Sequence, residues 1–212
     1  MPDMLRFLTR LTTPAPEKKP ATPREYFSRM PEVDTPRLLL RRMTLKDAQD
    51  MYAYSRDEEV ARHVLWTAHT SIWETKGYIR WVMQQYRLGA PSSWCIVDKT
   101  SGHVVGTIGF MLWQPENASV EVGYSLARSH WNRGLMTEAL AAVLRECFTT
   151  LRLHRVEAQH FSANPASGRV MAKCGMTHEG TLRRRICNKG QFMDVEMWGI
   201  LRSDWEQQHT AE

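Results

Sequence analysis

Apolar and polar residues alternate over residues 119–126, which predicts a β-strand with one face on a core. The apolar positions are Val120, Val122, Tyr124 and Leu126. Over residues 135–151, apolar residues recur every three or four positions, which predicts an amphipathic helix of about four turns. A short turn that ends at Gly134 joins the strand to the helix.

The turn itself has the features of an anion-binding site. The first N–H groups of a helix have no partner within the helix, and the helix dipole favours negative charge beside them. Arg128, His130 and Arg133 add positive side chains, and Gly134 has no Cβ to keep a phosphate from the backbone. An ordinary strand-to-helix connection with a solvated basic rim is the alternative. The phosphate motifs GxxxxGKS/T and GxGxxG are absent from the sequence, which argues against a P-loop or Rossmann site.

The same two periodicities predict the remaining elements. Strands are expected over residues 37–42, 94–98, 104–112, 155–160, 181–187 and 192–201, and helices over residues 57–64, 71–88 and 164–173, with another that begins at Thr44. Turn residues at 99–102 and 114–117 predict two consecutive hairpins that lead into the strand at 119–126. The expected architecture is therefore α+β, with a mixed, mainly antiparallel sheet and helices on both of its faces.

The start of the chain differs in composition from the remainder, because seven of the ten prolines fall within the first thirty-six positions. We expect residues 1–33 to form a flexible, Pro-rich extension, residues 34–205 to form one domain, and residues 206–212 to be a tail. Residues 4–11 carry apolar positions on one helical face with arginines nearby, so a targeting or membrane-surface segment is the alternative for the first residues.

The composition is that of a globular protein, with 212 residues and 42% hydrophobic content. No run of eighteen apolar residues is present in the sequence, so no membrane span is expected. The net charge of +5 favours an anionic ligand or an acidic partner without identifying either. The four cysteines have neither CxxC spacing nor a paired histidine, which favours reduced thiols in the cytoplasm over disulfides or a metal site.

Residues 131–140, with the sequence WNRGLMTEAL, resemble the acetyl-CoA pyrophosphate loop of the GNAT N-acetyltransferases. In the general form of that loop, Q/R-x-x-G-x-G/A, only Gly134 matches, since Trp131 and Met136 occupy the outer positions. The branch that includes the ribosomal-protein N-terminal acetyltransferases instead has an aromatic residue, a basic residue, Gly, a hydrophobic pair and T-E-A. The sequence is similar to that version.

Further segments resemble the same family in the same order. Residues 35–41 are similar to its opening strand, residues 105–109 to its G-x-I-G strand, and residues 153–158 to the strand after its long helix. Residues 164–167 and 170–176 are similar to its N-x-x-S motif and to the helix that follows. Together these matches cover residues 34–205, and the resemblance implies the GNAT fold.

The resemblance also implies a binding site for acetyl-CoA as co-substrate, with no metal. The residues expected to bind it are Leu126, Arg128, Arg133, Gly134, Leu135, Met136, Thr137, Asn164 and Ser167. Asn164 corresponds to the residue that binds the pantetheine arm, and Ser167 to a serine beside the CoA sulphur, where we expect it to assist catalysis. An ordinary helix N-terminus is the alternative for both residues.

Transfer of an acetyl group to an amine benefits from a general base, because an alkyl ammonium holds its proton at neutral pH. Glu121 is the candidate, since it lies on the face opposite Val120 and Val122 and its strand leads into the turn. Partial burial would raise the pKa of its carboxyl group. A surface glutamate without a catalytic role is the alternative. The resemblance assigns the oxyanion donors to backbone N–H groups of residues 124–126.

The expected activity is direct acetyl transfer in a ternary complex, with no cysteine acyl-enzyme, to a primary amine at a protein or peptide N-terminus. Acetylation of a small amine, such as a polyamine or an antibiotic, is one alternative. A non-catalytic acyl-CoA sensor or a ribosome-associated module is another. Ribosome association and a homodimer remain open. Aromatic residues cluster at Trp66, Trp73, Tyr78 and Trp81; in the family these helices form a wall of the acceptor cleft, and plain core packing is the alternative.

Overall fold

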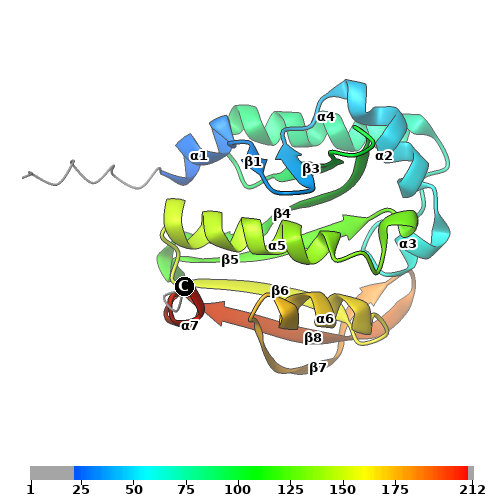
Figure 1. Cartoon of the computed structure of the whole chain (residues 1–212). Helices are drawn as coiled ribbons and strands as arrows, with labels where there is room; N and C mark the ends of the chain where they lie inside the picture. The colour runs from blue at the N-terminus through cyan, green and yellow to red at the C-terminus, as the bar shows by residue number, and fades with distance from the viewer. Residues whose placement is uncertain (1–21, 210–212) are drawn as a thin grey trace, which may run out of the picture.

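A single sheet of eight strands, in the order β1-β2-β3-β4-β5-β6-β8-β7, forms the centre of the computed structural model, which describes residues 22–209 (Figure 1). The strands are β1 (Val33–Asp34), β2 (Leu38–Arg41), β3 (Ser93–Asp98), β4 (Val104–Gln114), β5 (Ser119–Leu126), β6 (Arg155–Phe161), β7 (Thr177–Asn188) and β8 (Gln191–Leu201). The pair β5 and β6 is parallel, and the other six neighbouring pairs are antiparallel. The predicted hairpins and mainly antiparallel sheet are confirmed.

Helices cover both faces of this sheet. They are α1 (Pro23–Arg29), α2 (Ala48–Ser55), α3 (Glu58–Arg62), α4 (Ile72–Leu88), α5 (Leu135–Arg145), α6 (Pro165–Lys173) and α7 (Arg202–His209), with short turns η1 (Leu45–Asp47), η2 (Pro115–Asn117), η3 (Arg128–His130) and η4 (Glu146–Thr150). Figure 1 shows α5 and α6 side by side along one face. Successive side chains of β5 point to opposite faces of the sheet. On one face Ser125 bonds to Tyr54 of α2, and on the other Tyr124 donates to the Ser167 carbonyl of α6.

The predicted strand, turn and helix fold as the hydrophobic pattern requires. β5 spans the predicted residues, and its apolar side chains Val120 and Val122 are buried. The helix differs in its second half, because α5 ends at Arg145 and continues as the π-helical turn η4. Cys147 and Phe148 of η4 are still buried, so the apolar stripe of the sequence is satisfied although the helix changes its hydrogen-bond pattern.

Residues 22–33, which the sequence analysis placed in a flexible extension, instead form α1 and the start of β1. The Thr22 hydroxyl and the Glu25 carboxylate cap the start of α1, and Pro23 occupies its first turn, where a proline costs no hydrogen bond. Phe27 is buried in the core, and the Trp94 indole N–H donates to the Pro31 carbonyl at 2.7 Å. The packed part of the chain therefore begins before Asp34.

α7 (Arg202–His209) forms the C-terminal end of the described structure. α7 continues to His209, beyond the expected domain end at residue 205. Residues 1–21 and 210–212, which include the 4–11 segment, lie outside the described residues. Within residues 22–209, no helix is both long enough and apolar enough to cross a membrane.

Replacing Phe27 with Ala tests whether α1 belongs to the core. We expect Phe27→Ala to lower the free energy of unfolding by about 3–5 kcal/mol, because it removes a buried ring that packs edge-on against Phe110 and Trp113. Urea denaturation measures this change. Phe192→Ala is the matched control, since that ring is 62% exposed and its loss should change stability by less than about 0.5 kcal/mol. Equal effects of the two substitutions would contradict the packing of α1.

Candidate functional site

The two parallel strands at the centre of the sheet separate partway along their length. β5 pairs with β6 only from Ser119 opposite Arg155 to Glu121 opposite Glu157, although β5 continues to Leu126 and β6 to Phe161. Two cavities open where the strands part, and both are lined by residues 122–125 and 159–160. The candidate site therefore lies where β5 and β6 diverge.

We name the two cavities by the helices beside them. The α2/α4 cavity has a volume of about 270 Å³ and is lined by Tyr54, Tyr78, Thr107 and Glu121, among others. The α5/α6 cavity has a volume of about 490 Å³ and is lined by seven of the nine residues expected to bind acetyl-CoA. These seven are Leu126, Gly134, Leu135, Met136, Thr137, Asn164 and Ser167.

The backbone of β5 faces the opening between the strands. Ala127 donates its N–H to the Val105 carbonyl at 2.7 Å, and Leu126 lies opposite Gly106 in β4. Because hydrogen-bonded pairs alternate along an antiparallel ladder, Tyr124 and Leu126 direct their N–H and C=O groups away from β4, toward the edge where β6 has departed. The Leu126 carbonyl accepts the indole N–H of Trp131 at 2.8 Å. The N–H groups of Tyr124 and Leu126 therefore face the opening between the strands.

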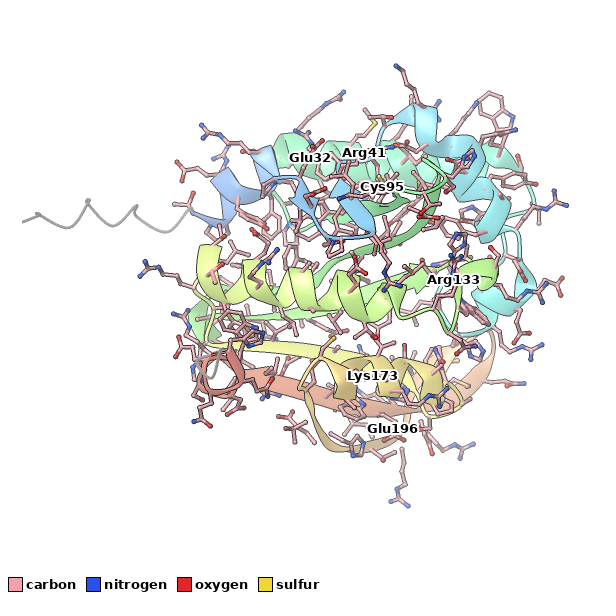
Figure 2. All side chains as sticks on the ribbon, in the orientation of Figure 1. Glu32, Arg41, Cys95, Arg133, Lys173 and Glu196 are labelled. Carbon is pink, nitrogen blue, oxygen red and sulfur yellow. The ribbon has the colours of Figure 1, made fainter. Side chains whose placement is uncertain are left out.

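The turn before α5 presents the first N–H groups of that helix to the α5/α6 cavity. Gly134 is the N-cap residue, with φ of 74°, a conformation that suits glycine. Figure 2 shows Arg133 in the loop that enters α5. Neither Arg128 nor Arg133 is among the residues that line the cavity, and Arg128 bonds to the Asp57 carboxylate at 3.1 Å. The two expected basic residues therefore lie at the rim, with one of them paired to a carboxylate.

Two residues to which the sequence analysis gave no role hold this turn in place. The Glu138 carboxylate accepts hydrogen bonds from the Thr35 hydroxyl at 2.7 Å, from the Arg37 N–H at 2.8 Å and from Arg37 Nε at 2.6 Å. Arg37 Nη1 also donates to the Arg133 carbonyl at 2.9 Å. Arg37 thus joins the segment before β2 to the turn before α5. Both residues fall in segments that resemble the family, but a contact between positions 101 residues apart has no local sequence signal.

The Glu121 side chain enters the α2/α4 cavity, where its Oε1 accepts a hydrogen bond from Gln159 Nε2 at 2.7 Å. Burial raises the pKa of the Glu121 carboxyl above its usual value, and the negative charge of Glu157 raises it further, against the opposing effect of Gln159. A carboxylate with a raised pKa is a stronger base than an ordinary surface glutamate. The geometry and the direction of the shift both suit proton transfer.

Asn164 and Ser167 lie on the other side of the opening, at the start of α6. The Asn164 side chain does not cap the helix, and both residues line the α5/α6 cavity. The Tyr124 hydroxyl, which the sequence analysis did not single out, donates to the Ser167 carbonyl at 3.2 Å. Burial raises the pKa of Tyr124, so its hydroxyl stays protonated. Tyr124 therefore ties α6 to β5 beside Ser167.

His160 lines both cavities, yet its geometry is unsuited to proton transfer. Its Nδ1 lies 2.8 Å from the Phe161 carbonyl, which only accepts, so Nδ1 carries the hydrogen. Its Nε2 then accepts the Trp198 indole N–H at 3.2 Å. Both ring nitrogens are therefore occupied in a neutral imidazole, which leaves Glu121 as the better base.

Neither thiol chemistry nor metal binding has a basis among residues 22–209. The Cys174 thiol bonds to the Thr137 carbonyl near the α5/α6 cavity, and burial raises its pKa to about 12. A thiol with that pKa stays protonated and is a poor nucleophile. No group of three or more His, Cys, Asp or Glu residues in this part of the chain could hold a metal ion.

Comparison with known proteins agrees with this geometry. Residues 37–177 match the family described as "Acetyltransferase (GNAT) domain". The chain is 32% identical over 171 residues to the uncharacterized N-acetyltransferase p20 of Bacillus licheniformis, an alignment that covers 81% of this chain and 96% of that protein. It is 25% identical over 192 residues to the ribosomal protein uS5-alanine N-acetyltransferase of Escherichia coli, covering 85% and 96% of the two chains.

Solved structures show the same fold. The structure of RimL, a ribosomal L7/L12 alpha-N-protein acetyltransferase in complex with coenzyme A, has a TM-score of 0.73 and 19% identity over 81% of this chain and 98% of that one. The microcin C7 self-immunity acetyltransferase MccE, in complex with acetyl-CoA and AMP, has a TM-score of 0.72 and 19% identity over 79% and 93% of the two chains.

The chain belongs to the GNAT acetyltransferase family. It is an N-acetyltransferase that uses acetyl-CoA, and its α+β architecture is the GNAT fold. The family resemblance stated from the sequence motifs is therefore confirmed.

The Glu138 contacts predict a pH-dependent stability. Burial of Glu138 is outweighed by its hydrogen bonds and by the Arg37 charge, which together hold the pKa of its carboxyl below the usual 4.5. The contribution of Glu138 to the free energy of unfolding is therefore complete above pH 4.5 and is lost as the pH falls through its lower pKa in the folded state. We expect Glu138→Gln to lower the free energy of unfolding by about 1 kcal/mol near neutral pH and by less in acid. Urea denaturation across this range, with the exposed Glu116→Gln as control, checks the prediction; a pH-independent difference would contradict it.

Proposed function

We propose that this enzyme transfers the acetyl group of acetyl-CoA directly to the α-amine at the N-terminus of a protein or peptide. The position of Glu121 beside Gln159, where the two cavities adjoin, is the observation that carries this proposal. The amine enters through the α2/α4 cavity and acetyl-CoA occupies the α5/α6 cavity. A relative that acetylates ribosomal protein uS5 supports a protein acceptor.

The proposed pose places the pyrophosphate of acetyl-CoA at the start of α5. N–H groups of residues 135–137 bind its oxygens, and Gly134 leaves room for them. Arg128 and Arg133 supply positive potential from the rim. Asn164 contacts the pantetheine arm, which runs along the open edge of β5 beside Leu126.

The proposed reaction begins when Glu121 takes a proton from the acceptor ammonium, directly or through water. The amine nitrogen then attacks the thioester carbon, and the N–H groups of Tyr124 and Leu126 donate to the oxygen as it becomes negative. The carbon–sulphur bond breaks as the carbonyl re-forms, the nitrogen loses its second proton to the CoA thiolate, and CoA leaves as the thiol. Ser167 donates a hydrogen bond to the departing sulphur. Free CoA thiols have a pKa near that of cysteine, about 8.5, so this donor assists the step without being essential.

A cytoplasmic location is also part of the proposal, supported by the four cysteines, none of which forms a disulfide in the described structure. Any association with the ribosome and any homodimer would be additional to the transfer reaction, which uses residues of one chain.

Replacing Glu121 with Gln tests the base. We expect Glu121→Gln to reduce kcat by about 100- to 10,000-fold while acetyl-CoA binding by calorimetry is unchanged. In the wild type, kcat/KM should fall in acid with an apparent pKa above the usual 4.5, since the base must be deprotonated and burial raises its pKa. Thiol release measures both quantities.

The control for this prediction is Glu157→Gln, which removes a neighbouring carboxylate outside the reaction. We expect turnover to be retained and the acidic limb to move to lower pH, because the charge of Glu157 raises the pKa of Glu121. Unchanged turnover in Glu121→Gln would remove Glu121 from the mechanism. A Glu121→Gln variant that binds acetyl-CoA normally, together with a wild type that acetylates no amine, would favour the sensor alternative.

Replacing Gly134 with Asp tests the pyrophosphate site. We expect Gly134→Asp to weaken acetyl-CoA binding by roughly 100-fold, because it adds a negative charge at the start of α5, where the phosphate groups are proposed to bind. Gly102→Asp is the matched control, since Gly102 has a similar φ of 73° in an open turn away from both cavities. Calorimetry compares the two variants. Normal affinity in Gly134→Asp would mean that acetyl-CoA does not bind at the start of α5.

A further inference from the structure

The α2/α4 cavity is almost free of charge. Glu121 is its one carboxylate, and no Lys or Arg is among the described residues that line it. The three histidines in its lining offer little positive charge: burial lowers the pKa of His69, and His160 is held as a neutral ring. His63 lies 3.7 Å from the Glu59 carboxylate, which balances any charge it carries.

Apart from the Gln159 amide, which bonds to Glu121, the remaining lining is apolar or consists of neutral hydroxyl groups. Trp66, Met111 and Phe161 supply apolar surface. The hydroxyls of Tyr54 and Tyr78 both bond to Thr107, and burial raises the pKa of each phenol, so these groups stay neutral. A polar group in this part of the cavity would meet hydroxyl groups that already have partners.

Gly123, which lines the cavity, carries no side chain of its own. Gly123 of β5 lies opposite Gly109 of β4, between Glu121 and Ser125 on the same face. A Cβ at Gly123 would come within 2.8 Å of Met111 Cγ, so the Met111 side chain already covers this glycine. The surface between Glu121 and Ser125 is therefore formed by the uncharged Met111 side chain.

We infer that the acceptor amine carries only uncharged groups near its nitrogen, as a peptide N-terminus with a neutral first residue does. This inference rests on the proposed function and narrows its substrate class. A free amino acid or a peptide that begins with Asp or Glu would place a carboxylate in a cavity that offers it no cation, and an unpaired buried charge is costly. A polyamine would bring a second ammonium, and Glu121 is already occupied by the reacting one.

A panel of acceptors tests this inference on the wild-type enzyme. The panel contains peptides that differ only in a first residue of Ala, Asp or Lys, together with alanine amide, free alanine and spermidine, and thiol release from acetyl-CoA is the readout. We expect kcat/KM for the Ala peptide to exceed that for the Asp or Lys peptide by on the order of 100-fold. Alanine amide should exceed free alanine, which carries a carboxylate in place of the neutral amide, once the rates are compared at the same concentration of neutral amine.

A charge introduced into the cavity supplies an independent test. Met111 lines the cavity and is 58% exposed, so Met111→Arg adds a cation with little risk to folding. The matched control is Leu112→Arg, the next residue, which is 48% exposed and is not among the lining residues. We expect Met111→Arg to raise kcat/KM for the Asp peptide at least about tenfold relative to the Ala peptide, and Leu112→Arg to leave that ratio unchanged.

The outcomes separate this inference from the proposed function. No thiol release with any acceptor would overturn both. Acetylation of Ala and Asp peptides at equal rates would overturn the inference and leave N-terminal transfer intact, and a preference for spermidine would overturn the N-terminal acceptor itself. An unchanged ratio in Met111→Arg would show that the charge of this cavity does not select the acceptor.

Discussion

The separation of β5 from β6 is the constraint on which the site depends. Parallel pairing holds the strands together only as far as Glu121, and every group assigned to the reaction lies at or beyond that point. The unpaired edge of β5 supplies backbone donors, one cavity opens on each face, and the last paired residue of β5 carries the carboxylate. A sheet that stayed paired along both strands would satisfy its backbone and leave no space for two reactants.

The parts of this arrangement that follow from local pattern could be predicted from the sequence. The alternation in β5, the glycine turn and the apolar stripe of α5 are short-range signals, and each of them placed its element within a few residues. The start of the domain was predicted too late, because prolines were taken as a sign of an extended chain whereas Pro23 occupies a helix start. Proline content alone does not distinguish an extended segment from the first turn of a helix.

Features that join distant segments could not be predicted in the same way. The Arg37 and Glu138 contacts, the bond from Tyr124 to Ser167, and the pairing of Gly109 with Gly123 arise from tertiary packing and sheet register. Family resemblance identified some of these positions without indicating their partners. Seven of the nine predicted acetyl-CoA contacts line one cavity, while Arg128 and Arg133 do not. A sequence motif does not specify the direction of a side chain at the rim of a cavity, so this difference could not be predicted.

The wall of the α2/α4 cavity near Val64 is bonded to the tip of the β7–β8 hairpin. Asn188 Nδ2 donates to the Val64 carbonyl at 3.2 Å, and Lys189 Nζ donates to the Ala61 carbonyl at 2.6 Å. These contacts span 124 and 128 residues. The acceptor half of the site is therefore incomplete until the last hairpin of the chain has been synthesised and has folded.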